Sequence, residues 1–99
     1  MSDDVLLADE PAPGVRRLRL NRPAALNALN VALRHALARA FTEADADEAV
    51  RVVVLGGSER AFCAGADLTE YRDATPAEIV ARRMGPLWDA VARCRKPVI

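Results

Sequence analysis

The sequence predicts an α/β fold in which two parallel strands are joined by a helix. Residues 15–21 alternate apolar and polar side chains, which indicates a strand with one face in solvent. Residues 26–44 repeat apolar side chains every three or four positions, as one face of a helix does. Residues 52–55 form a continuous apolar run, typical of a strand buried on both faces. This order indicates a crossover unit, which is right-handed in nearly all proteins.

A hairpin is expected before this unit. Residues 5–8 predict a strand, and residues 11–14 supply proline and glycine for a turn. In the strand that follows, Arg17 and Arg19 face one side and the leucines beside them face the other.

The predicted helix has one apolar face and two candidate caps. Asn27 or Asn30 can cap its start, because a short polar side chain accepts a bond from a first-turn N–H. Arg34 and Arg39 fall mostly outside the apolar stripe. The stripe consists of Leu26, Leu29, Leu33, Leu37, Phe41 and Ala44.

A second helix is predicted from residue 75 onward. Thr75 fits the N-cap, Pro76 the first helical position and Glu78 a capping box. The proline of Gly85–Pro86 conflicts with a straight helix, so we expect a kink or restart there. Residues 96–99 then indicate the start of another buried strand. The apolar face of this helix is expected to hold Val80, Met84, Leu87, Val91 and Cys94.

Composition excludes several classes of function. The chain has 99 residues, enough for one small domain, and fourteen basic residues balance fourteen acidic ones. This balance argues against a nucleic-acid binder. Cys63 and Cys94 match neither a metal-ligand pattern nor a disulfide framework. We see no signal peptide and no run long enough to span a membrane, so we expect a cytoplasmic protein without metal or membrane binding.

The stretch "RAFCAGADL", residues 60–68, has two interpretations. In the first, Gly65 makes a tight bend, and Phe62 and Leu68 anchor the loop in the core. In the second, the small residues allow a ligand to reach the backbone. A helix starting near Asp67 would leave N–H groups free to polarise a carbonyl or hold an oxyanion. The glycine spacing is not that of a nucleotide-binding phosphate loop.

Three blocks carry a family resemblance. "LNRPAALNALN", "VVVLGGSERAFCAGADL" and "ARCRKPVI" resemble, in order and spacing, the N-terminal half of the enoyl-CoA hydratase/isomerase (crotonase) family. The blocks span residues 19–99. The resemblance implies a spiral of ββα units, with residues 1–99 forming the N-terminal part of one crotonase-like domain and ending as a core strand begins.

The resemblance also implies roles for individual residues. In the family, the residue after the glycine of the "AGAD" stretch gives its N–H to the thioester oxygen, which points to Ala66. Residues around this donor line the adenine pocket, and the "RPAALNAL" segment contacts the pantetheine and phosphate part of coenzyme A. The implied substrate-binding positions are Ala64, Gly65, Asp67 and Leu68 in the first group and Ala24, Ala25 and Leu26 in the second.

Two departures from the family pattern matter. Many relatives carry lysine at the position of Ala24, so phosphate contacts are expected from Arg22 or from elsewhere. The family's second oxyanion N–H and its catalytic glutamates follow the "KPVI" block, after residue 99. Residues 1–99 are therefore expected to hold half of the oxyanion hole and part of the coenzyme A site, without the acid/base.

The expected activity is the hydration of a trans-2-enoyl-CoA thioester. The resemblance implies no metal or redox cofactor, because coenzyme A arrives as part of the substrate, and it implies a homotrimer or hexamer. The alternative is a non-catalytic fragment or truncated paralogue that binds coenzyme A or serves as an assembly partner.

Other polar residues carry weaker signals. His35 is expected on the surface, because no ligand partner lies at a suitable spacing. Cys63 is expected to pack beside Phe62 rather than act as a nucleophile. Asp67 is expected to cap a helix rather than to transfer protons. Glu70, Tyr71 and Asp73 stay open as residues of an acyl pocket.

Overall fold

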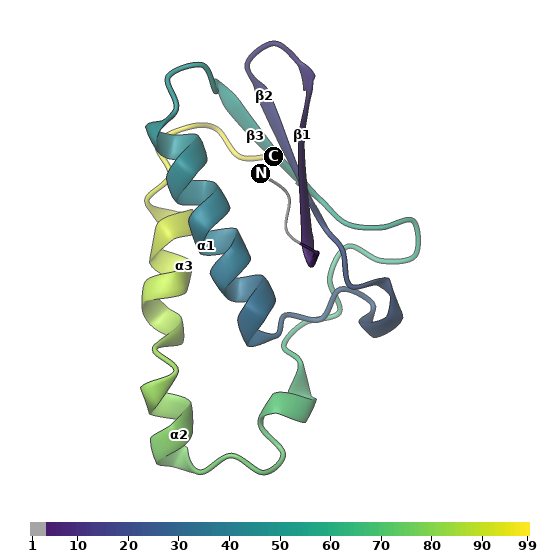
Figure 1. Ribbon diagram of the computed structural model, residues 1–99, viewed down its shortest axis with the longest axis vertical. Helices are drawn as coiled ribbons and strands as arrows, with labels where there is room; N and C mark the ends of the chain where they lie inside the picture. Colours follow the sequence, from purple (N-terminus) through teal and green to yellow (C-terminus); the bar gives the residue numbers. More distant parts are fainter. Residues whose placement is uncertain (1–3) are drawn as a thin grey trace.

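The computed structural model describes residues 4–99, with every side chain except that of Met84. Its three strands lie in the order β1–β2–β3, and helices cover one side of the sheet (Figure 1). Strands β1 and β2 pair in antiparallel orientation. Strands β2 and β3 pair in parallel orientation and are connected by α1, as the crossover prediction requires. The elements are β1 (Leu6–Ala12), β2 (Val15–Leu20), α1 (Val31–Ala46), β3 (Val52–Gly56), α2 (Pro76–Ala81) and α3 (Met84–Ala92).

The core lies between the sheet and α1, and α3 packs alongside α1. Cys63, Val91 and Cys94 are partly buried and pack against this core, as expected for the two cysteines. The core residues are aliphatic except for one phenylalanine: Leu6, Leu18, Leu20, Leu33, Ala36, Leu37, Phe41, Ala44, Val50 and Val53.

Strand β1 runs further than the sequence predicts. It includes Pro11, and the turn is confined to Pro13 and Gly14. The φ of Gly14 is 81°. Proline is tolerated because β1 is an edge strand, and its pairing with β2 shifts register between Asp9 and Ala12. The predicted turn at residues 11–14 is therefore wrong for residues 11 and 12, which belong to the strand.

Strand β2 confirms the predicted alternation and adds a buried charge. Leu18 and Leu20 are buried, and so is Arg16, which is only 3% exposed. The Arg16 guanidinium pairs with Glu10 at 3.1 Å and with Asp47 at 3.4 Å. This arginine links the hairpin to the end of α1.

Helix α1 begins later than its apolar pattern suggests. Its N-cap is Asn30, whose side chain accepts the Leu33 N–H at 2.8 Å. The segment before it is a short 3-10 helix, Pro23–Ala25, followed by Leu26 and Asn27 in the left-handed region with φ of 52° and 59°. Two left-handed residues in succession cannot continue a right-handed helix, so Leu26 leaves the stripe.

The second helical region also differs from the prediction. The capping box of Thr75 and Glu78 is confirmed. The break, however, lies at Arg83, whose φ is 52°, and Pro86 falls in the first turn of α3, where its missing N–H costs nothing. The earlier break turns Val80 away from the core, and its side chain is 77% exposed.

The segment after α3 is tied to the end of α1. Lys96 Nζ donates to the carbonyls of Ala44, at 2.8 Å, and Asp47, and the Arg95 N–H donates to an Asp45 carboxylate oxygen at 2.9 Å. Residues 97–99 thereby reach β3, where Val53 forms an isolated parallel bridge with Val98. The predicted strand start at "KPVI" is confirmed as a pairing, although Val98 is exposed.

Asn27 ties residues 22–30 to the loop after β3. Its side chain is fully buried, and its Oδ1 accepts the Arg22 N–H at 2.8 Å. Its Nδ2 donates to the Ala61 carbonyl at 3.0 Å and to Ser58 Oγ at 3.3 Å. Of the two cap candidates, Asn30 caps α1 and Asn27 joins two loops that are distant in sequence.

We predict that Asn27→Ala lowers the free energy of unfolding by about 3 kcal/mol, because it leaves the Arg22 N–H without its acceptor, removes one of the donors to the Ala61 carbonyl and places alanine at a positive φ. Denaturant titration of the intact protein measures the change. Asn21→Ala is the matched control, because Asn21 makes only an exposed bond to the Asp4 carbonyl, and it should cost less than about 1 kcal/mol. Equal costs would contradict the linking role.

The Asp45 contact predicts a pH dependence. The hydrogen bond from the Arg95 N–H, assisted by the Arg95 guanidinium, holds the pKa of Asp45 below its ordinary value. The stability from ionised Asp45 is therefore complete above about pH 5 and is lost as the pH falls through the lowered pKa. Asp45→Asn should lower the unfolding midpoint at pH 7, and its difference from the native protein should shrink below about pH 4. An unchanged difference at low pH would contradict this linkage.

Candidate functional site

The residues before α1 and the residues after β3 lie side by side (Figure 1). The Ala64 N–H donates to the Leu26 carbonyl at 3.0 Å. The Leu29 N–H donates to the Gly65 carbonyl at 2.7 Å, and the Leu29 carbonyl accepts the Asp67 N–H at 3.0 Å. These bonds bring the first two family-like sequence blocks together.

The N–H of Ala66 is not used by this pairing. Leu29 and Ala66 form a parallel bridge, in which the bonds to Leu29 come from the residues on either side of Ala66. Among residues 4–99 no group accepts the Ala66 N–H, and Ala66 is exposed. The group therefore points away from Leu29 and is free to meet a ligand. Its role as an oxyanion donor stays a prediction.

Two glycines shape this segment for different reasons. Gly65 has a φ of 116°, which side-chain-bearing residues rarely adopt, and no atom lies within 4 Å of where its Cβ would be. Gly57 has no such strain, but a Cβ there would lie 2.5 Å from the Ala61 carbonyl oxygen and from the Phe62 Cα. Gly65 therefore sets the direction of the chain before Ala66, and Gly57 allows the loop to close tightly.

From residue 62 to residue 68, every second residue is exposed. Phe62 is 55% exposed and Leu68 is 76% exposed, so the interpretation in which they anchor the loop in the core is wrong. The bridge to Leu29 explains this, because an extended segment turns alternate side chains away from its partner. Ala64 and Ala66 lie on the exposed side with them.

Asp67 is a capping carboxylate, as expected. It accepts the Thr69 N–H at 3.1 Å and the Thr69 hydroxyl at 2.6 Å, at the start of a 3-10 helix (Leu68–Glu70). Arg22 Nη2 pairs with it at 3.1 Å. The hydrogen bond from the Thr69 hydroxyl, assisted by Arg22, holds the pKa of Asp67 below its usual range. A carboxylate that stays ionised and capped is a poor proton donor at neutral pH.

Arg22 is committed to contacts within the chain. Its guanidinium pairs with Asp67 and donates to the Ala28 carbonyl, and its side chain is only 19% exposed. Ala24 and Leu26 in the same segment are exposed, and Ala25 is half-buried. The phosphate contact expected from Arg22 or from elsewhere stays a prediction.

Glu70 has a role that the sequence pattern does not reveal. Both of its carboxylate oxygens lie 3.0 Å from the Val31 N, the first N–H of α1. Tyr71 faces the Arg82 guanidinium at 5.4 Å, and Asp73 lies on the surface beside Arg72. No local signal marks Glu70 as a cap, because the helix it caps begins 39 residues earlier.

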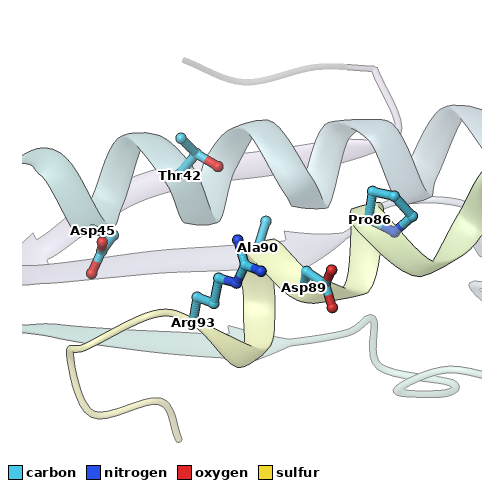
Figure 2. Close-up of a pocket in the computed structure, with 6 residues that line it drawn as sticks. All are labelled: Thr42, Asp45, Pro86, Asp89, Ala90 and Arg93. Atoms are coloured by element: carbon cyan, nitrogen blue, oxygen red, sulfur yellow. The ribbon is translucent and has the colours of Figure 1, made fainter.

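Two hollows lie near these elements. An apolar hollow of about 230 Å³ adjoins the Leu29–Ala66 bridge and is lined by Leu20, Leu29, Leu37, Leu55, Phe62, Cys63 and Trp88. A second hollow of about 290 Å³ lies in the seam between α1 and α3 (Figure 2). Its lining residues include Thr42, Asp89 and Arg93, and none of them belongs to the segment around Ala66.

The described residues contain neither a metal-binding cluster nor a membrane-spanning helix. Residues 4–99 contain no cluster of three or more side chains able to hold a metal ion. His35 is exposed, as expected. No helix of this part of the chain is long and apolar enough to cross a bilayer.

Known proteins match both the sequence and the structure. The model of the enoyl-CoA hydratase/isomerase family matches residues 10–99. A probable enoyl-CoA hydratase of Rhizobium meliloti is 45% identical, and a probable peroxisomal enoyl-CoA hydratase of Arabidopsis thaliana is 34% identical. Each match covers the whole of this chain but only 38% and 37% of those proteins.

Among solved structures, an enoyl-CoA hydratase/carnithine racemase from Magnetospirillum magneticum matches with a TM-score of 0.89 and 34% identity, over 98% of this chain and 38% of that one. An enoyl-CoA hydratase from Bacillus anthracis matches with a TM-score of 0.86 and 31% identity, over 95% and 38%. The fold resemblance inferred from the three blocks is confirmed. With its sheet order, its bridged blocks and these matches, the chain belongs to the enoyl-CoA hydratase/isomerase family and has part of the crotonase fold.

Proposed function

We propose that this protein acts on acyl-CoA thioesters and that the Ala66 N–H is one of two donors holding the thioester oxygen. The observation that carries the proposal is the Leu29–Ala66 bridge, because it fixes the backbone on both sides of Ala66 and leaves this N–H unpaired and exposed. A fixed donor pays no reorganisation cost when charge develops on the oxygen.

The reaction we propose is hydration of a trans-2-enoyl-CoA. Attack of water on the β-carbon moves negative charge onto the thioester oxygen, and a positioned N–H stabilises that charge by about 3–4 kcal/mol. A second donor and two carboxylates complete the mechanism in the family pattern, after the "KPVI" block. Asp67 is not one of these carboxylates in our proposal, since it is held ionised by Thr69 and Arg22.

We propose that coenzyme A lies over the exposed apolar residues next to the bridge. Ala24 and Leu26 come from one block, and Ala64 and Leu68 from the other; all four are exposed. The small side chains of Ala24 and Ala64 allow the pantetheine and adenine groups to approach the backbone. In this proposal coenzyme A belongs to the substrate, no separate cofactor is used, and the protein assembles as a trimer or a pair of trimers.

The second candidate is a protein that binds coenzyme A or assists assembly without catalysis. The carboxylates nearest to Ala66 favour it, because each is engaged within the chain: Asp67 by Thr69 and Arg22, and Glu70 by the Val31 N–H. Binding of coenzyme A by the native protein without any turnover of crotonyl-CoA would favour this candidate over the first.

We predict that Ala66→Pro lowers kcat for enoyl-CoA hydration by about 10²–10³-fold, because proline has no N–H to donate. Binding of free coenzyme A, which lacks the thioester, should change little. Ala66→Gly keeps the N–H and is expected to retain at least about a tenth of the native kcat. Similar kinetics for Ala66→Pro and Ala66→Gly would contradict the proposed role of the Ala66 N–H as a donor to the thioester oxygen.

A second substitution tests the coenzyme A surface. Ala24→Lys places a cation on an exposed position where relatives contact phosphates, so we expect KM to fall about two- to fivefold at low salt, with the gain lost at high salt. Ala92→Lys, an exposed position at the end of α3, is the control and should leave KM unchanged. A gain shared by both variants, or by neither, would place coenzyme A elsewhere.

A further inference from the structure

One arginine is buried beside the candidate site without a carboxylate partner. Arg34 lies on α1 and is only 7% exposed, although the sequence pattern places it mostly outside the apolar stripe. None of the ion pairs among residues 4–99 includes it, and its Nε has no hydrogen-bond partner. Its buried contacts are neutral: the Leu29 carbonyl, 3.3 Å from Nη2, and the Trp88 ring, 5.6 Å from the guanidinium carbon.

Burying a cation in this way is costly. A charge removed from water without an opposite charge loses several kcal/mol, and a carbonyl and an aromatic face recover only part of that. An apolar side chain would fill the space without this cost. The buried guanidinium therefore indicates a function that needs its charge or its N–H donors, which an apolar residue lacks.

Leu29 is the residue through which Arg34 reaches the site. The Leu29 carbonyl has two acceptor positions, and the structure fills both, one with the Asp67 N–H at 3.0 Å and one with Arg34. The Leu29 N–H donates to the Gly65 carbonyl at 2.7 Å. The orientation of one peptide thus sets the direction of the segment that carries Ala66.

The second contact of Arg34 anchors it to another element. Trp88 belongs to α3, which packs alongside α1, and it lines the apolar hollow together with Leu29. The guanidinium therefore contacts both the Trp88 ring and the Leu29 carbonyl. These contacts link the carbonyl to α1 and α3, in addition to the bridge of one residue pair.

We propose that Arg34 is a positioning residue for the oxyanion donor. It holds the Leu29 carbonyl and, through the bridge, aims the Ala66 N–H at the thioester oxygen. This inference rests on the proposed function of Ala66.

The test uses the intact protein with three variants. Arg34→Met removes the donor and the charge while keeping an unbranched apolar chain, and it should lower kcat about tenfold with KM changed less than about twofold, as the loss of one ordinary hydrogen bond predicts. Arg34→Lys keeps a charged donor and should recover kcat to within about threefold of the native value. Arg93→Met is the control, because Arg93 is exposed directly after α3 and its side chain makes no hydrogen bond or ion pair among residues 4–99.

A spectroscopic measurement distinguishes a role of Arg34 in aiming the Ala66 N–H from a role in the stability of the fold. A bound conjugated thioester such as cinnamoyl-CoA absorbs at longer wavelength when its carbonyl is polarised. Arg34→Met should reduce this red shift while the thioester remains bound, whereas a purely structural role would lower the unfolding temperature and leave the red shift and kcat of the folded protein intact. Should Arg34→Met fail to fold, Arg34→Leu, which also lacks a donor, takes its place with the same expected loss of red shift.

A variant that combines Ala66→Pro with Arg34→Met distinguishes the positioning role of Arg34 from the proposed function of Ala66. With Ala66→Pro already present, Arg34→Met should cause no further loss of kcat, since there is no N–H left to aim. If Ala66→Pro lowers kcat and Arg34→Met lowers neither kcat nor the red shift, the positioning role is overturned while the proposed function stands. If Ala66→Pro changes neither quantity, the proposed function itself fails.

Discussion

The single parallel bridge between Leu29 and Ala66 is the contact on which the candidate site depends. It joins a segment before α1 to a segment after β3, and neither belongs to the main sheet. A parallel pairing of one residue uses the groups on either side of Ala66 and leaves its own N–H turned outward. The site is therefore a consequence of where two irregular segments meet, and the sheet and α1 serve to bring them together.

Polar groups hold this meeting point together with the apolar packing of Leu29 and Cys63 against the core. Asn27 is fully buried and links residues 22–30 to the loop after β3, and the Arg22–Asp67 pair adds a second link. Glu70 joins the same region to the first N–H of α1. Hydrogen bonds fix direction more tightly than apolar contacts do, because their strength falls steeply with angle. A backbone that must present one N–H in one direction benefits from this kind of support.

Local patterns predict much of the framework. The alternation in β2, the strand at β3, the capping box at Thr75 and the cap at Asp67 are confirmed, because each depends on residues that are neighbours in the chain. The predicted burial of β3 on both faces is wrong for residues 4–99, because only Val53 of this strand is buried. The start of α1 is predicted too early, since the stripe continues through Leu26 while the backbone does not. The break before α3 is displaced for the same reason: a left-handed residue at Arg83 ends the helix where no proline or glycine stands.

The sequence by itself determined the fold class and the family, because these follow from short-range periodicity and from blocks of adjacent residues that resemble the family, and the same resemblance pointed to Ala66. Only the tertiary structure decided which buried polar groups meet around the segment that carries Ala66. Arg34 belongs to a helix whose stripe excludes it, yet it is buried against Leu29 and Trp88. Glu70 caps a helix that begins 39 residues earlier. The partner of a buried polar group depends on which segments meet in space, and no local spacing in the chain records that meeting.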